Sequence, residues 1–105
     1  MFGIGEKKIE LGPNDYECKA HFFIKKHKAV LKLKEDYLEI EFVEKALNDN
    51  VKRYNYKNIT EISTLGKSIL FSDTGKPAED IVIKDSSKRK EVFDILTNKI
   101  NESGK

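Results

Sequence analysis

Apolar and polar residues alternate along the chain in several short stretches, and the first of these covers residues 16–24. One face carries Tyr16, Cys18, Ala20, Phe22 and Ile24, and the other carries Glu17, Lys19 and His21, with Phe23 as an exception. A period of two over these residues predicts a half-buried strand. Glycines and Pro13 break up the preceding residues 1–14, which predicts an irregular lead-in.

The next alternation predicts an antiparallel hairpin over residues 29–43, with a turn at Glu35 and Asp36. The polar run at 25–28 predicts a loop before it. The outward faces of the two hairpin strands carry opposite charges, Lys32 and Lys34 on one strand and Glu39 and Glu41 on the next. Cross-strand pairs of this kind help to set the register, at about 0.2–1 kcal/mol each.

The second half of the chain predicts four more short strands, at 51–56, 59–64, 68–72 and 80–84. After Asp85 the period changes to 3.6 residues, with Val92, Leu96 and Lys99 on one face, which predicts a helix capped by Asp85 or Ser86. The order therefore predicts a mainly β fold of about seven antiparallel strands, closed by one C-terminal helix.

Length and composition narrow the class of protein. The 105 residues suit one domain, which we expect at 15–103 after the lead-in at 1–14. The net charge is only +2 and the isoelectric point is about 8.6, which argues against a nucleic-acid module. The absence of a long apolar run and of a signal peptide favours a cytoplasmic protein. A single cysteine, Cys18, excludes an internal disulfide.

Three stretches together resemble the pleckstrin-homology-like (PH-like) family, most closely its bacterial PH-like and GRAM-like branch. They are residues 29–42, which look like the second and third strands, the Tyr56-x-x-Ile59-x-x-Ile62 spacing, and residues 92–96, which look like the closing helix. The resemblance implies a seven-stranded antiparallel barrel capped by the helix. It departs from many PH domains in lacking a tryptophan in that helix, where Phe93 takes the place.

The resemblance also implies a role for a lysine set made of Lys25, Lys26, Lys28, Lys32 and Lys34. In PH domains that bind inositol phosphates, the first loop holds the headgroup, and a basic-x-basic pair on the next strand completes the site. Lys26 followed by Lys32 and Lys34 is similar to that pattern, with lysine where arginine is usual. The alternative is a solvated surface paired with Glu39 and Glu41, and we favour it because charge runs usually face solvent.

Other chemistry finds little support in the sequence. Cys18 and His21 differ by three positions on a strand, so they face opposite sides and do not converge, with His27, on a metal. No nucleophile–base arrangement appears, and we expect neither an enzyme nor a cofactor. The basic helix start at 87–90 is either an anion site or solvated surface, and we favour the solvated surface.

These patterns predict a non-catalytic binding module whose partner is another protein or an identical subunit. Sheet edges readily add a strand, and exposed aromatic and apolar side chains anchor interfaces. The interface candidates are Phe23, Tyr37, Val43, Tyr54 and Tyr56, unless several of them pack under loops. The rival hypothesis is peripheral binding of an anionic membrane or phosphate headgroup through residues 25–34, and no nucleic-acid partner is expected.

Overall fold

The computed structural model of the chain describes residues 10–22, 25–43, 51–74 and 78–103. The elements are β1 (Asp15–Phe22), β2 (Lys25–Leu33), β3 (Tyr37–Phe42), β4 (Val51–Asn55), the 3-10 turn η2 (Tyr56–Asn58), β5 (Ile59–Leu65), β6 (Ser68–Asp73), β7 (Glu79–Val82) and α1 (Ser86–Ser103). The strands and the helix lie close to where the hydrophobic pattern predicts them. The lead-in at 1–14 falls mostly outside the described residues.

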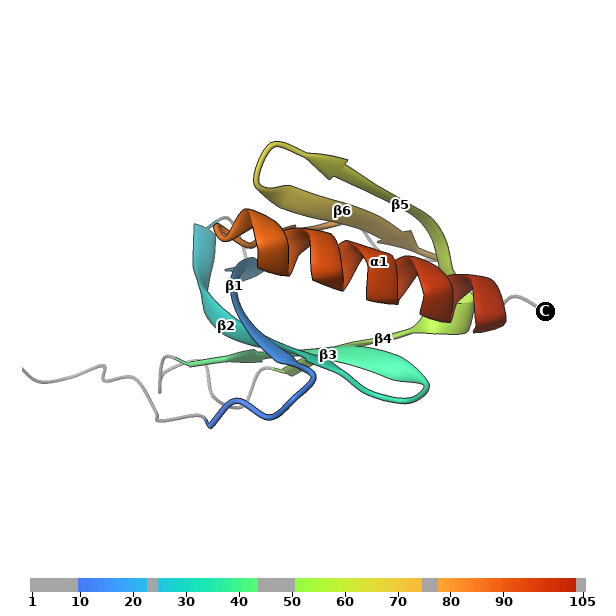
Figure 1. Cartoon of the computed structure of the whole chain (residues 1–105), viewed down its shortest axis with the longest axis horizontal. Coiled ribbons are helices and arrows are strands. Elements are labelled where there is room, and N and C mark those ends of the chain that lie inside the picture. Colours follow the sequence, from blue (N-terminus) through green and yellow to red (C-terminus); the bar gives the residue numbers. More distant parts are fainter. Residues whose placement is uncertain (1–9, 23–24, 44–50, 75–77, 104–105) are drawn as a thin grey trace, which may run out of the picture.

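The seven strands form one antiparallel sheet in the order β4-β3-β2-β1-β7-β6-β5. Strands β4 and β5 follow each other along the chain, yet they form the two opposite edges of the sheet. The sheet therefore curls into a half-barrel, and Figure 1 shows α1 between the β1–β4 part and the β5–β6 hairpin. This arrangement confirms the mainly β fold with one closing helix.

The core lies between the concave face of the sheet and α1. Its residues alternate along each strand, as a half-buried sheet requires. They are Tyr16, Cys18, Ala20, Ala29, Leu31, Leu33, Leu38, Ile40, Phe42, Tyr54, Tyr56, Ile59, Ile69, Phe71, Ile81, Ile83, Val92 and Leu96. The helix contributes Val92 and Leu96, both fully buried, which confirms the predicted apolar face.

Local contacts fix both ends of the helix face. The Lys88 backbone N–H donates to Asp85 Oδ1 at 3.0 Å, so Asp85 is the N-cap. Further along, Lys99 Nζ lies 5.6 Å from the centre of the Tyr56 ring, a cation–π contact between α1 and η2. Asp85 thus caps the start of the helix, and the contact between Lys99 and Tyr56 holds a later part of the helix against η2, which connects β4 and β5.

The predicted loop at 25–28 is wrong, because these residues begin β2. Lys25 to Lys28 pair in register with Phe22 back to Lys19 on β1. His27 points inward, and its ring packs edge-on against Phe22 and Phe42, at centroid distances of 6.2 and 6.5 Å. The lysines at the outward positions stay solvated, so a strand is compatible with this polar run.

No helix in the described part of the chain is long and apolar enough to cross a membrane.

Candidate functional site

Two members of the lysine set form ion pairs with acidic residues on other strands. Lys26 Nζ lies 3.1 Å from Asp80 Oδ2 on β7, and Lys32 Nζ lies 2.7 Å from Glu41 Oε1 on β3. Lys25, Lys28 and Lys34 are exposed. Two of the three lysines in the predicted headgroup pattern therefore have acidic partners, Lys26 on β7 across β1 and Lys32 on the adjacent β3.

The pKa values reflect this pairing. The hydrogen bond to Glu41 raises the pKa of Lys32. Burial alone would raise the pKa of Asp80, but hydrogen bonds from Ser68 and Lys26 outweigh it and lower the pKa. The other acid of the hairpin, Glu39, accepts from Arg53 Nε at 2.9 Å. The charges on this face thus balance across strands, as the solvated-surface interpretation expects for Lys32, while any ligand of the lysine set stays a prediction.

The interface candidates differ in how far their side chains are exposed. Tyr37 and Val43 are half-buried, and Phe23 lies outside the described residues. The prediction that Tyr54 and Tyr56 are exposed is wrong, because both are buried, at 6% and 0% exposure. Their hydroxyl groups are satisfied inside the fold. Tyr54 donates to Glu79 Oε2 at 2.6 Å, and Tyr56 donates to the Lys34 carbonyl at 2.8 Å.

A polar bridge that the sequence did not indicate crosses the concave side of the sheet. Lys52 Nζ on β4 lies 3.1 Å from Glu79 Oε2 on β7 and donates to the His21 carbonyl on β1 at 2.7 Å. Glu79 is 4% exposed, and it also accepts the Tyr54 hydroxyl. This bridge fastens an edge strand to the middle of the sheet, so its role is structural.

Cys18 is buried, and burial raises its pKa to about 12, with Glu79 adding to the shift. The thiol therefore stays protonated at neutral pH and is a poor nucleophile or metal ligand. Among the described residues, no group of three His, Cys, Asp or Glu side chains is placed to hold a metal ion.

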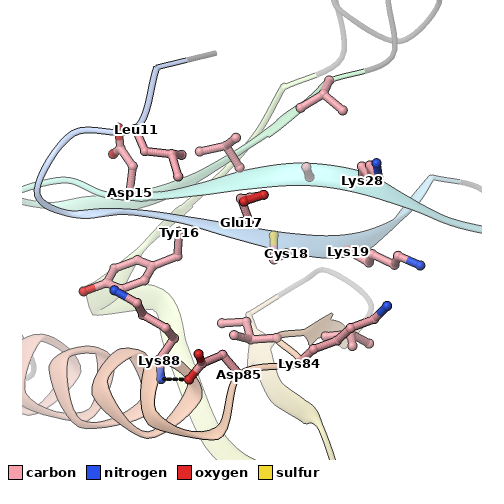
Figure 2. Close-up of a pocket in the computed structure, with 15 residues that line it drawn as sticks. Leu11, Asp15, Tyr16, Glu17, Cys18, Lys19, Lys28, Lys84, Asp85 and Lys88 are labelled. Carbon is pink, nitrogen blue, oxygen red and sulfur yellow. Dashed lines mark hydrogen bonds between the residues drawn. The ribbon is translucent and has the colours of Figure 1, made fainter. Parts of the chain in front are cut away.

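An open groove lies between β1 and the connection from β7 to α1, with a volume of about 710 Å³. Its apolar lining includes Leu11, Val30, Val43, Val82 and Ile83. Four lysines also line it, and Figure 2 shows Lys19, Lys28 and Lys84 gathered at one end, with Lys88 beside Tyr16 at the other. Sequence reasoning missed this groove, because its residues come from the lead-in, three strands and the start of the helix.

Tyr16 forms the wall of the groove next to the helix. Its hydroxyl donates to Glu91 Oε2 on α1, and Lys88 Nζ lies 6.0 Å from the centre of its ring. Burial, followed by the Glu91 contact, raises the pKa of Tyr16 to about 12. This end of the groove is therefore fixed by contacts between β1 and α1.

Solved structures with a similar fold include the DH/PH domains of RhoGEF proteins. The DH/PH domains of PDZ-RhoGEF in complex with GTP-γ-S-activated RhoA match with a TM-score of 0.67 and 12% identity, over 85% of this chain and 29% of that chain. The linker-DH/PH domains of p115-RhoGEF match with a TM-score of 0.65 and 13% identity, over 92% and 30%. This chain thus covers less than a third of each of those chains.

A third match covers most of both chains. It is the C-terminal domain of an unknown protein from Leishmania infantum, with a TM-score of 0.66 and 13% identity, over 84% of this chain and 82% of that chain. No protein-family model matches the sequence, and no curated protein matches it either. At this level of identity the likeness shows the fold alone. The fold is PH-like, and membership of a bacterial or GRAM-like branch stays a prediction.

Proposed function

We propose that this chain is a non-catalytic binding module, and that it joins a protein partner, a second copy of itself included, along the exposed edge of β5. The observation that carries the proposal is the open sheet, which ends in β5 on one side. An edge strand presents unpaired backbone N–H and C=O groups, and these groups pair readily with a strand of another chain.

The composition of β5 suits such pairing. Its seven residues include one charged side chain, Glu61, and no proline. Apart from Ile59 and Ile62 they are exposed, and Leu65 at the tip is 71% exposed. Natural edge strands that avoid pairing usually carry several charges, a proline or a bulge, and here the bulge lies only at the start, between Ile59 and Glu61.

The register shows which backbone groups of β5 face outward. Leu65 pairs with Ser68 across the two-residue turn of Gly66, at φ +61°, and Lys67. The closing pair of such a hairpin exchanges both hydrogen bonds, and the bonds then alternate along the ladder. The N–H groups of Thr64 and Ile62 therefore point away from β6, toward the free edge.

Thr64→Pro tests the proposal, because it removes an outward donor and leaves the β5–β6 ladder intact. Thr64→Ala is the matched control that keeps the N–H group. We expect light scattering to show a wild-type mass that rises with concentration above the 12.1 kDa monomer. The proline variant should shift toward the monomer and the alanine variant should not. A wild-type monomer over a hundredfold dilution range would rule out self-assembly.

The alternative, anionic headgroup binding through residues 25–34, has weaker support. Lys26 and Lys32 already lie against Asp80 and Glu41, so a headgroup would have to compete with these carboxylates. We therefore rank it second. Only this alternative would place the protein at a membrane surface. For the function along the β5 edge we propose a cytoplasmic location.

A further inference from the structure

The free edge of β5 is complementary to a second copy of itself, and this inference rests on the function proposed above. The register with β6 shifts between Ile59 and Glu61, so only the last five residues of β5 pair regularly with β6. Within this regular segment the N–H and C=O groups of Ile62 and Thr64 point toward the free edge. One copy of β5 therefore offers two donors and two acceptors to a neighbouring strand.

Antiparallel pairing of two identical strands allows only a few registers. The outward groups must meet, so Ile62 and Thr64 of one copy have to face outward residues of the other. A two-fold axis through Ser63 pairs Ile62 with Thr64 of the second copy, and Thr64 with Ile62 of the second copy. All four outward groups of each copy are then bonded, and every pair lies in the regular part of the strand.

The neighbouring registers are less favourable. An axis through Ile62 would require pairing by Thr60, the extra residue at the bulge. An axis through Glu61 would place this side chain opposite its own copy, and like charges directly opposite each other destabilise a sheet. An axis through Thr64 would set Ile62 opposite Gly66, which lies in the turn beyond the strand. The first register therefore avoids the bulge, the charge repulsion and the turn.

The side chains also suit the axis through Ser63. Glu61, Ser63 and Leu65 alternate on one face of β5 and are exposed, with Leu65 at 71% exposure. In this register the two Ser63 side chains lie opposite each other, and small hydroxyl groups fit the close approach of a non-hydrogen-bonded pair. Glu61 lies opposite Leu65 of the second copy, and its methylene groups take apolar surface of that leucine out of water. The two Glu61 carboxylates lie at opposite ends of the ladder.

We propose that the partner of the β5 edge is a second copy of this chain, joined by antiparallel β5–β5 pairing about a two-fold axis through Ser63. Two-fold dimers are the commonest symmetric assemblies, and such an interface uses the same surface of both subunits. The two sheets then form one continuous sheet, and β5 is no longer a free edge in either copy. A single strand pair is a small interface, so the dimer is weak and depends on concentration.

Single cysteines test the register. Non-hydrogen-bonded partners lie with their Cα atoms about 4.5 Å apart, within the range that a disulfide spans. Under mild oxidation, Ser63→Cys should therefore form a disulfide-linked dimer of twice the 12.1 kDa monomer mass on a non-reducing denaturing gel. Glu61→Cys and Leu65→Cys are the matched controls on the same face, and each should give a monomer alone and a linked dimer when the two are mixed. Wild type should not link, because Cys18 is buried.

The pattern of links identifies the register. If Ser63→Cys links to Glu61→Cys and not to itself, the axis passes through Ile62 and the proposed register is wrong. That result would leave the function along the β5 edge standing, because the edge would still be paired. Equal linking of all three single variants would indicate random collisions and would overturn the pairing.

Hydrogen exchange separates this inference from the function on which it rests. As the protein concentration rises, the amides of Ile62 and Thr64 should exchange more slowly, and that of Ser63, which faces β6, should not change. A dimer without this protection, or a monomer at every concentration, would overturn β5–β5 pairing. An added peptide of alternating valine and threonine then tests the edge alone. Protection of the Thr64 amide by the peptide would keep the β5 function with another protein as the partner, and no protection would reject that function as well.

Discussion

Lys52 and Glu79 meet on the concave side of the sheet, with Nζ 3.1 Å from Oε2, although three strands separate β4 from β7 in the sheet order. The pair also involves Tyr54, whose hydroxyl donates to the same carboxylate oxygen and whose ring packs edge-on against Phe71 at 5.0 Å. The β4 edge of the curled sheet is thereby linked directly to β7 across the concave face.

We expect Lys52→Met to destabilise the fold by about 1–3 kcal/mol, because it leaves a buried carboxylate with one hydrogen bond fewer. Adding Glu79→Gln should recover part of the loss, since a neutral amide needs less compensation in that position. Urea unfolding of the two single variants and the double variant measures the coupling. Strictly additive losses would show that the two side chains do not interact in solution.

The closing helix gives a second prediction. Leu96 has no exposed surface and belongs to the core, so Leu96→Ala should cost about 2–5 kcal/mol. Asn98→Ala, at an exposed position on the same helix, is the control and should change stability by less than about 0.5 kcal/mol. Thermal or urea unfolding reports both variants. An unchanged midpoint for Leu96→Ala would remove α1 from the core.

Periodicity predicted the strands and the helix well, because burial repeats every second residue in one case and every 3.6 residues in the other. The errors occur where a lysine stands at an inward or pairing position. Lys52 lies on the same face of β4 as Tyr54, and a lysine there makes the face look solvent-exposed in the sequence. In the fold the aliphatic part of the Lys52 side chain is covered, and its ammonium group reaches Glu79. The polar run at 25–28 was predicted as a loop for the same reason, although it begins β2.

The groove could not have been predicted from local pattern. Its walls form where the pairing between β1 and β7 ends, and these are the first and the last strand of the described residues. Val30 illustrates the difficulty, because it alternates with Ala29 and Leu31 as an outward residue, yet it is only 3% exposed. The lysines were visible in the sequence, but Lys19, Lys28 and Lys84 come together only in the folded sheet.

Alkaline pH should weaken the fold through its tyrosines. The pKa of Tyr16 is raised to about 12, chiefly by burial, and burial also raises the pKa values of Tyr54 and Tyr56. These phenols ionise near pH 10.0 when unfolded, so their contribution to stability is complete below pH 10.0 and is lost as the pH rises through the folded values.

The measurement is the urea midpoint between about pH 9 and pH 11.5, followed beside tyrosinate absorbance. Wild type should lose stability with rising pH, and Tyr16→Phe should lose it less steeply, because one of the raised phenols is gone. Glu91→Gln should reduce the slope only partly, since burial contributes more than Glu91 to the raised pKa of Tyr16. Identical slopes in wild type and Tyr16→Phe would contradict the raised value.

The last prediction separates ion pairing from lipid binding in the lysine set. We change Lys26, Lys32 and Lys34 to glutamine together. If the lysines only form ion pairs within the sheet, the free energy of unfolding of the triple variant should be slightly lower than that of wild type, because two surface ion pairs of about 0–1 kcal/mol each are lost. Neither form should then bind anionic vesicles. If they form a headgroup site, wild type should bind vesicles in a salt-dependent way, and the triple variant should bind about a hundredfold more weakly, at roughly 1 kcal/mol per lysine. The contacts with Asp80 and Glu41 lead us to expect the first result. Vesicle binding that survives both high salt and the triple change would contradict both interpretations, because such binding would be apolar and would have to involve residues outside the lysine set.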